Sequence, residues 1–194
     1  MITNKTIIID IDNTILCPME KWLLWGDKNS YHVDNVKVFK DYARKQVDYN
    51  FSNYFDLHEG VDGLDFFRQE DLYDDIELLP NAKQVITSLS EENTILFVSF
   101  SKSWHLKSKF SIIKRNFPWV IEGERGAFIS CKHKHHVPSD IFIDDRYELL
   151  NKHPSKLKVC MNTPFTQTEA LDENSVTRVD NWNEIGKLLG VDGY

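Results

Sequence analysis

The hydrophobic pattern of the chain is dominated by short, continuous apolar runs that end abruptly in polar residues. Continuous runs rich in isoleucine, valine and phenylalanine are typical of strands that a parallel sheet buries on both faces. The pattern predicts strands at residues 7–9, 94–98, 119–121, 127–129, 140–143 and 157–161.

Helical periodicity separates several of these runs. Apolar side chains recur at helical spacing in residues 80–90, and two further helices are expected at 102–116 and 181–189. Strands that alternate with helices of this length pair in parallel through right-handed crossovers. The chain is therefore expected to be an α/β protein with a three-layer, Rossmann-like parallel sheet. The last residues, 191–194, are expected to be a frayed tail.

The stretch after the first strand has a different character. Its aromatic residues are spaced irregularly among charges, helical spacing is visible at 34–45 and 61–68, and no strand pattern of comparable strength appears. We therefore expect residues 17–75, called the inserted segment below, to form a small, mostly helical cap after the first strand. Residues 1–16 and 76–194 would then form the α/β core. The aromatic residues of the inserted segment are Trp22, Trp25, Tyr31, Phe39, Tyr42, Tyr49, Phe51, Tyr54, Phe55, Phe66 and Phe67.

Length, cysteine content and charge narrow the classes of function. A chain of 194 residues suits one domain with an elaboration. The three cysteines are far apart and form no C-x-x-C pair, so neither a disulfide framework nor a zinc ribbon is expected. No apolar run approaches the length of a membrane span, and the first buried strand leaves no room for a signal peptide, so we expect a cytoplasmic protein that binds no membrane.

The net charge of −7 disfavours extended binding to nucleic acid, which needs a basic face. One basic cluster, Lys-His-Lys-His-His at 132–136, interrupts this acidic background. A small anionic substrate therefore remains compatible with the composition. A homodimer is also compatible with it, since the sequence does not reveal the oligomeric state.

Polar side chains follow three of the predicted strands: Asp10 and Asp12 follow the first, Ser99 the second, and the pair Asp144 and Asp145 a later one. An Asp-Asn-Thr turn alone could account for the first group. However, the carboxyl ends of parallel strands lie along one edge, so all three groups should converge. Four crowded carboxylates repel one another unless a cation shares their charge, and Mg²⁺ with several retained waters suits oxygen ligands. The convergence therefore predicts a metal-dependent site.

The order of these motifs resembles that of the haloacid dehalogenase-like (HAD) phosphohydrolases. The resemblance covers both ends of the chain, with the inserted segment where that superfamily places its cap. Three further stretches are similar to their counterparts in the 5'(3')-deoxyribonucleotidases: Asp-Ile-Glu-Leu-Leu-Pro at 75–80, Ile-Asp-Asp-Arg at 143–146 and Asp-Asn-Trp-Asn-Glu-Ile at 180–185.

The resemblance implies a role for each motif residue. Asp10 would be the nucleophile that forms an aspartyl-phosphate, and Asp12 the general acid and base. Mg²⁺ would be held by the Asp10 side chain, the Asp12 carbonyl and a carboxylate of the last motif. Asp145 is preferred as that ligand with Asp144 in support, although the sequence does not decide between them.

Phosphate binding is implied for Ser99 and for one lysine. Ser99 would donate to a phosphate oxygen, and the lysine would neutralise the phosphate and the phosphorylated aspartate. Lys132 and Lys134 compete for this role, and Lys134 is preferred because it keeps the spacing of the nucleotidases from Asp144.

Two cysteine-containing features admit other interpretations. Cys131, His133, His135 and His136 could bind zinc, but their spacing differs from that of the usual structural sites, so a solvated basic loop near the phosphate mouth is the preferred interpretation. Cys17 is expected to be a small packing residue rather than a nucleophile, because no basic partner is evident beside it.

Substrate selectivity should come from aromatic residues near the cleft. Phe67 falls where the nucleotidases place an aromatic residue beside the base, and Phe100, next to Ser99, is a second candidate substrate contact. The chain departs from that family after the first motif, where Pro18 and Met19 stand in place of an aromatic residue. Three hypotheses follow: a Mg²⁺-dependent nucleotidase for nucleoside monophosphates, particularly deoxyribonucleotides; a HAD phosphatase for a sugar phosphate or a nucleic-acid 3'-phosphate end; and a non-catalytic nucleotide-binding module.

Overall fold

The computed structural model describes residues 1–48 and 50–194, so Tyr49 of the inserted segment lies outside the described residues. Its main feature is a six-stranded sheet in the order β5-β4-β1-β6-β7-β8, in which every neighbouring pair is parallel. The strands are β1 (Thr6–Ile9), β4 (Thr94–Ser99), β5 (Gly126–Ser130), β6 (Ile141–Asp144), β7 (Leu157–Met161) and β8 (Val176–Val179).

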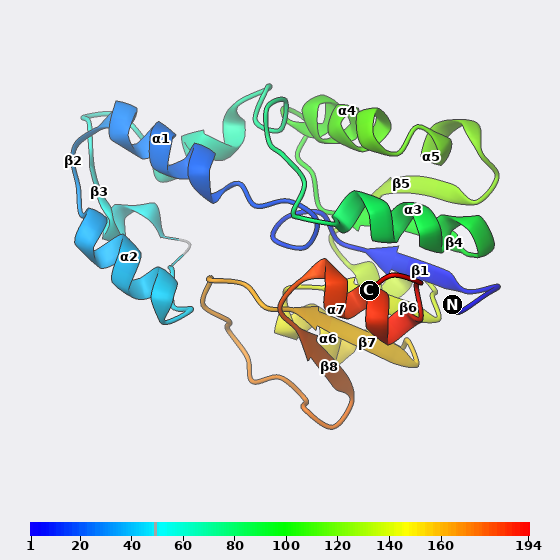
Figure 1. Ribbon diagram of the computed structural model, residues 1–194. Coiled ribbons are helices and arrows are strands. Elements are labelled where there is room, and N and C mark those ends of the chain that lie inside the picture. The colour runs from blue at the N-terminus through cyan, green and yellow to red at the C-terminus, as the bar shows by residue number, and fades with distance from the viewer. Residues whose placement is uncertain (49) are drawn as a thin grey trace.

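Strand β1 lies at the centre of this sheet, between β4 and β6 (Figure 1). In this register Ile9 pairs with Phe97 on one side and with Ile143 on the other. All three side chains are fully buried, as expected for central strands covered on both faces. The ends of β1, β4 and β6 are thereby aligned, and the polar residues that follow them meet at one edge.

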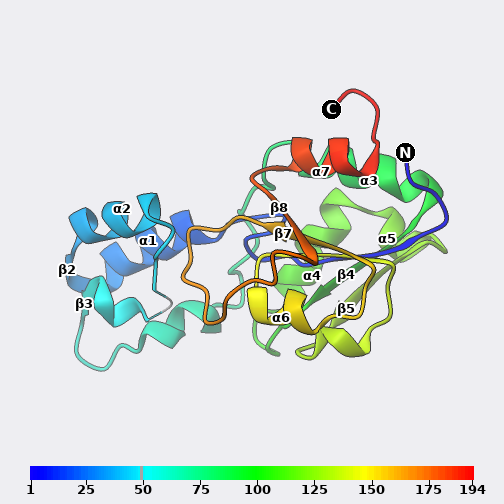
Figure 2. The ribbon, with the colours of Figure 1, turned by 90° about the horizontal axis from the view of Figure 1, so that it is seen from below.

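Helices cover both faces of the sheet, which confirms the predicted three-layer arrangement. Helices α3 (Ala82–Glu92), α4 (Leu106–Asn116), α5 (Trp119–Glu122) and α7 (Trp182–Leu189) share a hydrophobic cluster with Ile7 and Ile9. Helix α6 (Tyr147–Lys152) packs on the other face, in a cluster with Ile8. Figure 2 shows α3 and α7 on one side of the sheet and α6 on the opposite side.

The strands predicted at 94–98, 127–129, 140–143 and 157–161 are confirmed, whereas the one predicted at 119–121 is wrong. These residues form the helical turn α5, because Pro118 adopts helical angles at its N-cap and the Gly123 N–H closes the turn onto the Trp119 carbonyl. The edge strand β8 was not predicted, since its two central residues are polar and exposed and break the apolar run.

The C-terminal residues are packed rather than frayed. The Val191 N–H donates to the Gly186 carbonyl at 2.8 Å, and Val191 is buried. Tyr194 packs against Gly186, where any side chain would lie within 3.0 Å of the tyrosine Cβ. The prediction of a frayed tail is therefore wrong, because a glycine on α7 leaves room for the chain to fold back.

The inserted segment lies beside the carboxyl edge of the sheet (Figure 1). It contains α1 (Met19–Asn29), α2 (Asn35–Ala43) and the 3-10 turns η1 (Phe51–Asn53) and η2 (Gly63–Arg68). It also contains an antiparallel pair that the sequence did not predict, β2 (Ser30–Val33) with β3 (Phe55–Leu57). These strands are short and partly exposed, so neither has a clear apolar pattern.

The interior of the inserted segment is aromatic. The Trp22 ring contacts the Phe55 ring edge-on, with centroids 4.8 Å apart. Gly26 makes this packing feasible, since a Cβ there would lie 2.1 Å from the Phe55 ring. No helix in the described ranges, 1–48 and 50–194, has both the length and the apolar character needed to cross a membrane.

Candidate active site

The loop after β1 presents the first two carboxylates. Asp10 continues the β1 ladder onto β6, and the chain then turns through Asn13, whose φ of 59° is a left-handed conformation that asparagine tolerates. The Trp182 indole N–H of α7 donates to the Thr14 carbonyl at 2.8 Å. A local turn and a long-range hydrogen bond therefore hold Asp10 and Asp12 at the sheet edge.

Lys134 is the buried cation of the site. It lies in the 3-10 turn η3 (Lys134–His136), and its Nζ donates to Asp10 Oδ1 and, at 2.6 Å, to Asp144 Oδ2. Burial alone would lower the pKa of Lys134, but the carboxylates of Asp10 and Asp144 outweigh burial and raise it. Lys132, the other candidate, is exposed and lines the rim of the same cavity.

The two adjacent aspartates after β6 have different surroundings. Asp144 has both oxygens occupied, since Oδ2 accepts from Lys134 and Oδ1 accepts from the Arg146 N–H at 2.8 Å. Asp145 is also buried, but its Oδ2 has no hydrogen-bond partner in the part of the chain that the structure describes. Of this pair, Asp145 is therefore the aspartate that has a buried oxygen free to bind a cation or a hydrogen-bond donor.

Asp10, Asp144 and Asp145 fit a divalent cation. Each offers an oxygen within 4.8 Å of the other two, and the three side chains are buried. Burial raises the pKa of Asp144 to about 6, and burial together with Asp144 and Asp10 raises that of Asp145 well above its usual range. Three carboxylates against the single ammonium of Lys134 leave an excess of two negative charges, which a divalent ion with oxygen ligands would balance.

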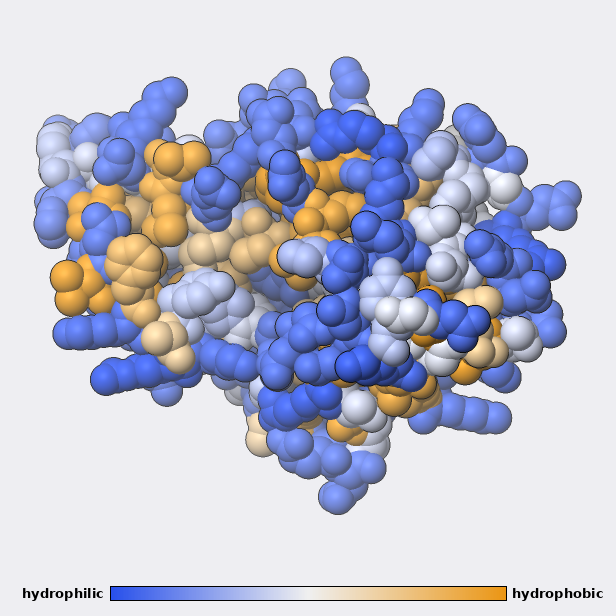
Figure 3. Space-filling view, in the orientation of Figure 1, coloured by the Kyte–Doolittle hydropathy of each residue, from blue (hydrophilic) through white to orange (hydrophobic). Residues whose placement is uncertain are grey.

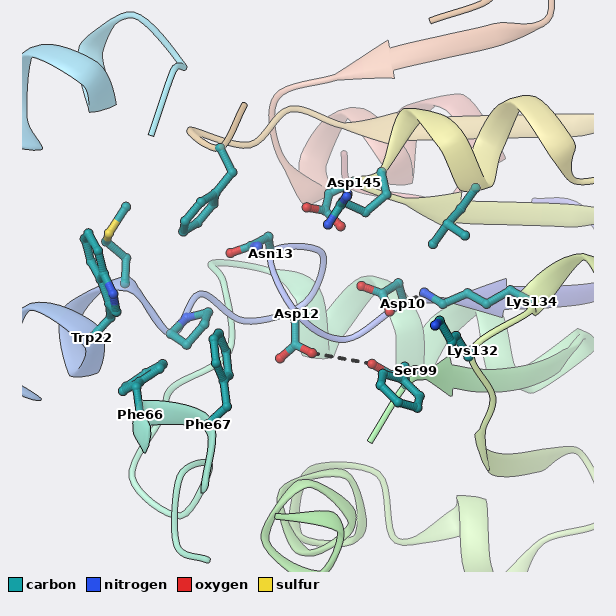
Figure 4. Close-up of a pocket in the computed structure, with 16 residues that line it drawn as sticks. Asp10, Asp12, Asn13, Trp22, Phe66, Phe67, Ser99, Lys132, Lys134 and Asp145 are labelled. Carbon is teal, nitrogen blue, oxygen red and sulfur yellow. Dashed lines mark hydrogen bonds and ion pairs between the residues drawn. The ribbon is translucent and has the colours of Figure 1, made fainter. Parts of the chain in front are cut away.

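Asp12 is held by a second lysine. Lys109 Nζ lies 2.5 Å from Asp12 Oδ2, 3.2 Å from Ser99 Oγ and 3.3 Å from the Phe100 carbonyl. It also lies 4.7 Å from the centre of the Tyr73 ring, and the lysine is almost completely buried. Ser99 Oγ is within 3.5 Å of the same Asp12 oxygen (Figure 4), whereas Asp12 Oδ1 is buried with no partner among the described residues.

Lys109 was not predicted as a site residue. It lies on α4 with Ile112 and Ile113, one helical turn away on the buried face. A lysine on the apolar face of an amphipathic helix is a usable signal, because lysine is almost never buried without a partner. The identity of that partner depends on a contact spanning 97 residues, which no local pattern contains.

A cavity of about 250 Å³ opens onto these charges. Figure 4 shows Asp10, Asp12, Ser99 and Lys134 on one side of it and the rings of Trp22, Phe66 and Phe67 facing them from the inserted segment. The cavity thus brings together an acidic, phosphate-sized corner and an aromatic wall. Its lining includes all the predicted site residues except Asp144, which lies behind Lys134: Asp10, Asp12, Phe67, Ser99, Phe100, Lys134 and Asp145.

Several wall residues were missed. Phe165 comes from the loop after β7, which pairs with the inserted segment through a bridge between Val47 and Phe165. The Val47 N–H donates to the Pro164 carbonyl and its own carbonyl accepts from the Thr166 N–H, both at 2.9 Å. Trp22 belongs to the aromatic set identified in the sequence, but its position on the cavity wall depends on how the inserted segment folds.

The alternative cysteine chemistry finds no geometric support. Among residues 1–48 and 50–194, the side chains that lie close enough together to share a metal ion are those of the three buried aspartates. Cys131, His133, His135 and His136 do not form a second group of this kind among these residues. Cys17 packs against the hydrophobic cluster, and burial raises the pKa of its thiol, which disfavours the nucleophilic thiolate.

The chain is similar to a known family in sequence and to solved structures in fold. The model of the family described as "5' nucleotidase, deoxy (Pyrimidine), cytosolic type C protein" matches residues 4–192. No protein of curated function matches the chain.

Solved structures with a similar fold are HAD-like hydrolases. One from Burkholderia xenovorans LB400 has a TM-score of 0.57 at 14% identity, covering 98% of this chain and 97% of that one. The HAD-hydrolase YfnB from Bacillus subtilis, solved bound to magnesium, has a TM-score of 0.51 at 12% identity, covering 98% and 100%. At these identities the structures show a common fold.

Proposed function

The chain belongs to the cytosolic type C family of 5' nucleotidases, and on that premise we propose that it is a Mg²⁺-dependent phosphomonoesterase that hydrolyses nucleoside monophosphates, deoxyribonucleotides in particular. The observation that carries this proposal is the arrangement around Asp10. Its carboxylate faces the cavity, contacts the buried Lys134 and lies beside Asp145, which has an unsatisfied oxygen.

The proposed reaction has two displacements at phosphorus. In the first, an Asp10 oxygen forms a bond to phosphorus while the bond from phosphorus to the ester oxygen breaks, and Asp12 gives its proton to the leaving alkoxide. In the second, water attacks phosphorus and gives a proton to Asp12, and the bond between phosphorus and Asp10 breaks. The products are the nucleoside and inorganic phosphate, and both aspartates return to their starting state.

The surroundings of Asp12 support its role as the proton carrier. Lys109 and Ser99 both contact Oδ2, and Asp12 lines the cavity beside Ser99, where the leaving oxygen would lie. Lys109 therefore acts as a positioning residue, since it holds the carboxyl group in one orientation. Lys134 neutralises charge at Asp10, and Ser99 is within reach as a donor to phosphate.

A divalent metal ion would be held by Asp10 and Asp145, with Asp144 in support through its bonds to Lys134 and the Arg146 N–H. When bound, Mg²⁺ would supply positive charge to the phosphate oxygens and to the carboxylates that Lys134 does not balance. The three buried carboxylates are the basis for assigning the ion to this position.

Selectivity for a nucleoside would come from the aromatic wall. Residues 17–75 are proposed to act as a cap that places Trp22, Phe66 and Phe67 opposite the phosphate corner. Aromatic rings stack on nucleobases with little dependence on the base, so the wall suits nucleosides better than a sugar phosphate, which has no flat apolar face.

The test is a panel of phosphate esters assayed by released inorganic phosphate, with and without Mg²⁺. Among mononucleotides and sugar phosphates we expect deoxyribonucleoside monophosphates to have the highest kcat/KM, and Asp10→Asn to abolish phosphate release from all of them. Preference for a sugar phosphate over every nucleotide would overturn the substrate assignment. Hydrolysis of p-nitrophenyl phosphate by the wild type and its loss in Asp10→Asn exclude a non-catalytic binding module.

A further inference from the structure

A second cavity lies against the same general acid. It has a volume of about 270 Å³ and shares Asp12, Phe67 and Phe100 with the first cavity. Its remaining walls come from the loop before α4, from Lys109 on α4, from η2 and from Tyr73, and it does not include Asp10 or Lys134. It therefore adjoins the side of the site where the alcohol leaves rather than the phosphate corner.

Its walls are held in place by hydrogen bonds that join the inserted segment to the core. His105 Nδ1 contacts the Phe67 carbonyl at 2.8 Å, and His105 Nε2 accepts from the Lys102 N–H at 3.1 Å. The Tyr73 N–H donates to Ser108 Oγ at 2.8 Å. These contacts fix the walls of the cavity relative to one another.

The mouth of the cavity exposes large apolar side chains. Leu64, Phe100 and Trp104 have exposed fractions of 59%, 48% and 38%. Figure 3 shows hydrophobic side chains gathered where the inserted segment meets the core. Two exposed aromatic rings that line one cavity with Asp12 indicate a binding surface for a flat apolar group.

The charges of the cavity leave one cation unbalanced. Arg68 is paired with Asp65, and Lys109 is paired with Asp12. Lys102 forms no salt bridge with any carboxylate in the described ranges, and its Nζ lies 5.3 Å from the centre of the Trp104 ring. An occupant should therefore combine a flat ring with a single negative charge close to it.

We propose that this cavity binds a second nucleotide unit of the substrate, joined by a phosphodiester to the nucleotide whose terminal phosphate reacts at Asp10. The phosphodiester carries one negative charge, which would pair with the ammonium of Lys102. The second base would stack on Trp104 and Phe100. The inference rests on the proposed function and deepens it: the substrate class extends to short oligonucleotides with a terminal phosphate. The terminal monoester is hydrolysed as described above, and the phosphodiester stays intact.

The experiment compares kcat/KM for phosphate release from a deoxyribonucleoside monophosphate with that from dinucleotides phosphorylated at the 5' or the 3' end. We expect a 5'- or 3'-phosphorylated dinucleotide to be the better substrate. In Trp104→Ala the ratio of dinucleotide to mononucleotide kcat/KM should fall about tenfold, since one stacked base is lost. Lys102→Ala should lower the ratio about threefold at low salt and remove much of its salt dependence.

Matched controls separate this subsite from general damage. Lys107→Ala, an exposed lysine at the start of α4 that lines neither cavity, and Phe39→Ala, an exposed aromatic residue on α2, should leave the ratio unchanged. Trp104→Phe should restore most of the loss.

The outcomes separate a failure of the second-nucleotide subsite from a failure of the proposed phosphatase function. Good turnover of the mononucleotide with poor turnover of both dinucleotides would overturn the inference and leave the proposed function standing. A ratio that does not change in Trp104→Ala and Lys102→Ala would also overturn it. Hydrolysis of neither nucleotide class, with another phosphate ester accepted, would overturn both.

Discussion

The carboxyl edge of the sheet and the aromatic wall of the inserted segment face each other across one cavity, but they are built in opposite ways. At the sheet edge, Lys134 and Lys109 are buried and contact the carboxylates of Asp10 and Asp12. On the wall, Phe67 is only partly buried, and its ring contacts the Phe66 ring edge-on. The edge is therefore suited to stabilise a reaction with large charge movements, and the wall to bind a flat apolar group.

This contrast has a kinetic consequence. Substitutions at the edge should lower kcat, because their contacts matter most when charge shifts toward the leaving group. Substitutions in the wall should raise KM, because stacking contributes equally to the bound substrate and the transition state. Comparing kcat with KM in single variants of the edge and the wall tests this division.

The largest effect is expected for the buried lysine at Asp10. Lys134→Ala removes the cation beside the nucleophile, and kcat should fall about 10²- to 10³-fold. Lys132→Ala, on the exposed rim, is the matched comparison and should change kcat only a few-fold. Steady-state phosphate release measures both, and thermal unfolding in Mg²⁺ checks that the variants fold. Near wild-type turnover in Lys134→Ala would reassign the phosphate lysine.

The lysine at Asp12 should have the next largest effect. Lys109→Met keeps a long apolar side chain on α4 but frees Asp12 Oδ2, so kcat should fall roughly 10- to 100-fold through misorientation of the acid. The loss should be smaller for an ester with a good leaving group, such as p-nitrophenyl phosphate, which needs less protonation. Lys107→Met on the same helix is the control. An equal loss for both leaving groups would show that Lys109 does not act through Asp12.

The wall should respond through KM. Phe67→Ala removes one stacking ring, and KM for a nucleoside monophosphate should rise about tenfold while kcat stays within a few-fold. Phe39→Ala removes an exposed ring that lines neither cavity and should leave both constants unchanged. If Phe67→Ala lowered kcat with KM unchanged, the division between edge and wall would be wrong.

The smallest effect is a shift in thermal stability with metal and pH. Burial raises the pKa of Asp144 and of Asp145, so the folded protein holds protons that the unfolded chain releases. In the absence of metal these two groups therefore lower the free energy of unfolding as pH rises above about 4, the ordinary aspartate value. Mg²⁺ should bind the charged carboxylates and raise Tm by a few degrees at about pH 8, with less effect at about pH 5.

Differential scanning fluorimetry at both pH values measures this shift. Asp145→Asn should reduce the Mg²⁺ response at the higher pH, because it removes a charge from the cluster. An equal Tm shift at both pH values, in the wild type and in Asp145→Asn, would argue against metal binding at the three aspartates.

Much of the core could be predicted because its signal is local. The run of isoleucines at 7–9 has to be buried on both faces, and the runs at 94–98 and 140–143 have the same requirement. Once these strands are parallel, Asp10, Ser99 and Asp145 lie along one edge whatever the loops do, and the strand order β4-β1-β6 brings them together. The turn α5 and the edge strand β8 were missed, because a proline next to a short apolar run and an exposed edge both weaken the periodic pattern.

By itself, then, the sequence determined the α/β architecture, the edge at which the motif residues gather, and the aromatic content of the inserted segment. Only the tertiary structure decided that Lys109 pairs with Asp12, that Asp145 rather than Asp144 keeps an unsatisfied oxygen, and that Phe165 completes the wall. The physical reason is the range of the interactions. Strand burial is encoded in consecutive residues, whereas the partner of a buried charge or ring is set by contacts between segments far apart in the chain, which form only when the chain is folded.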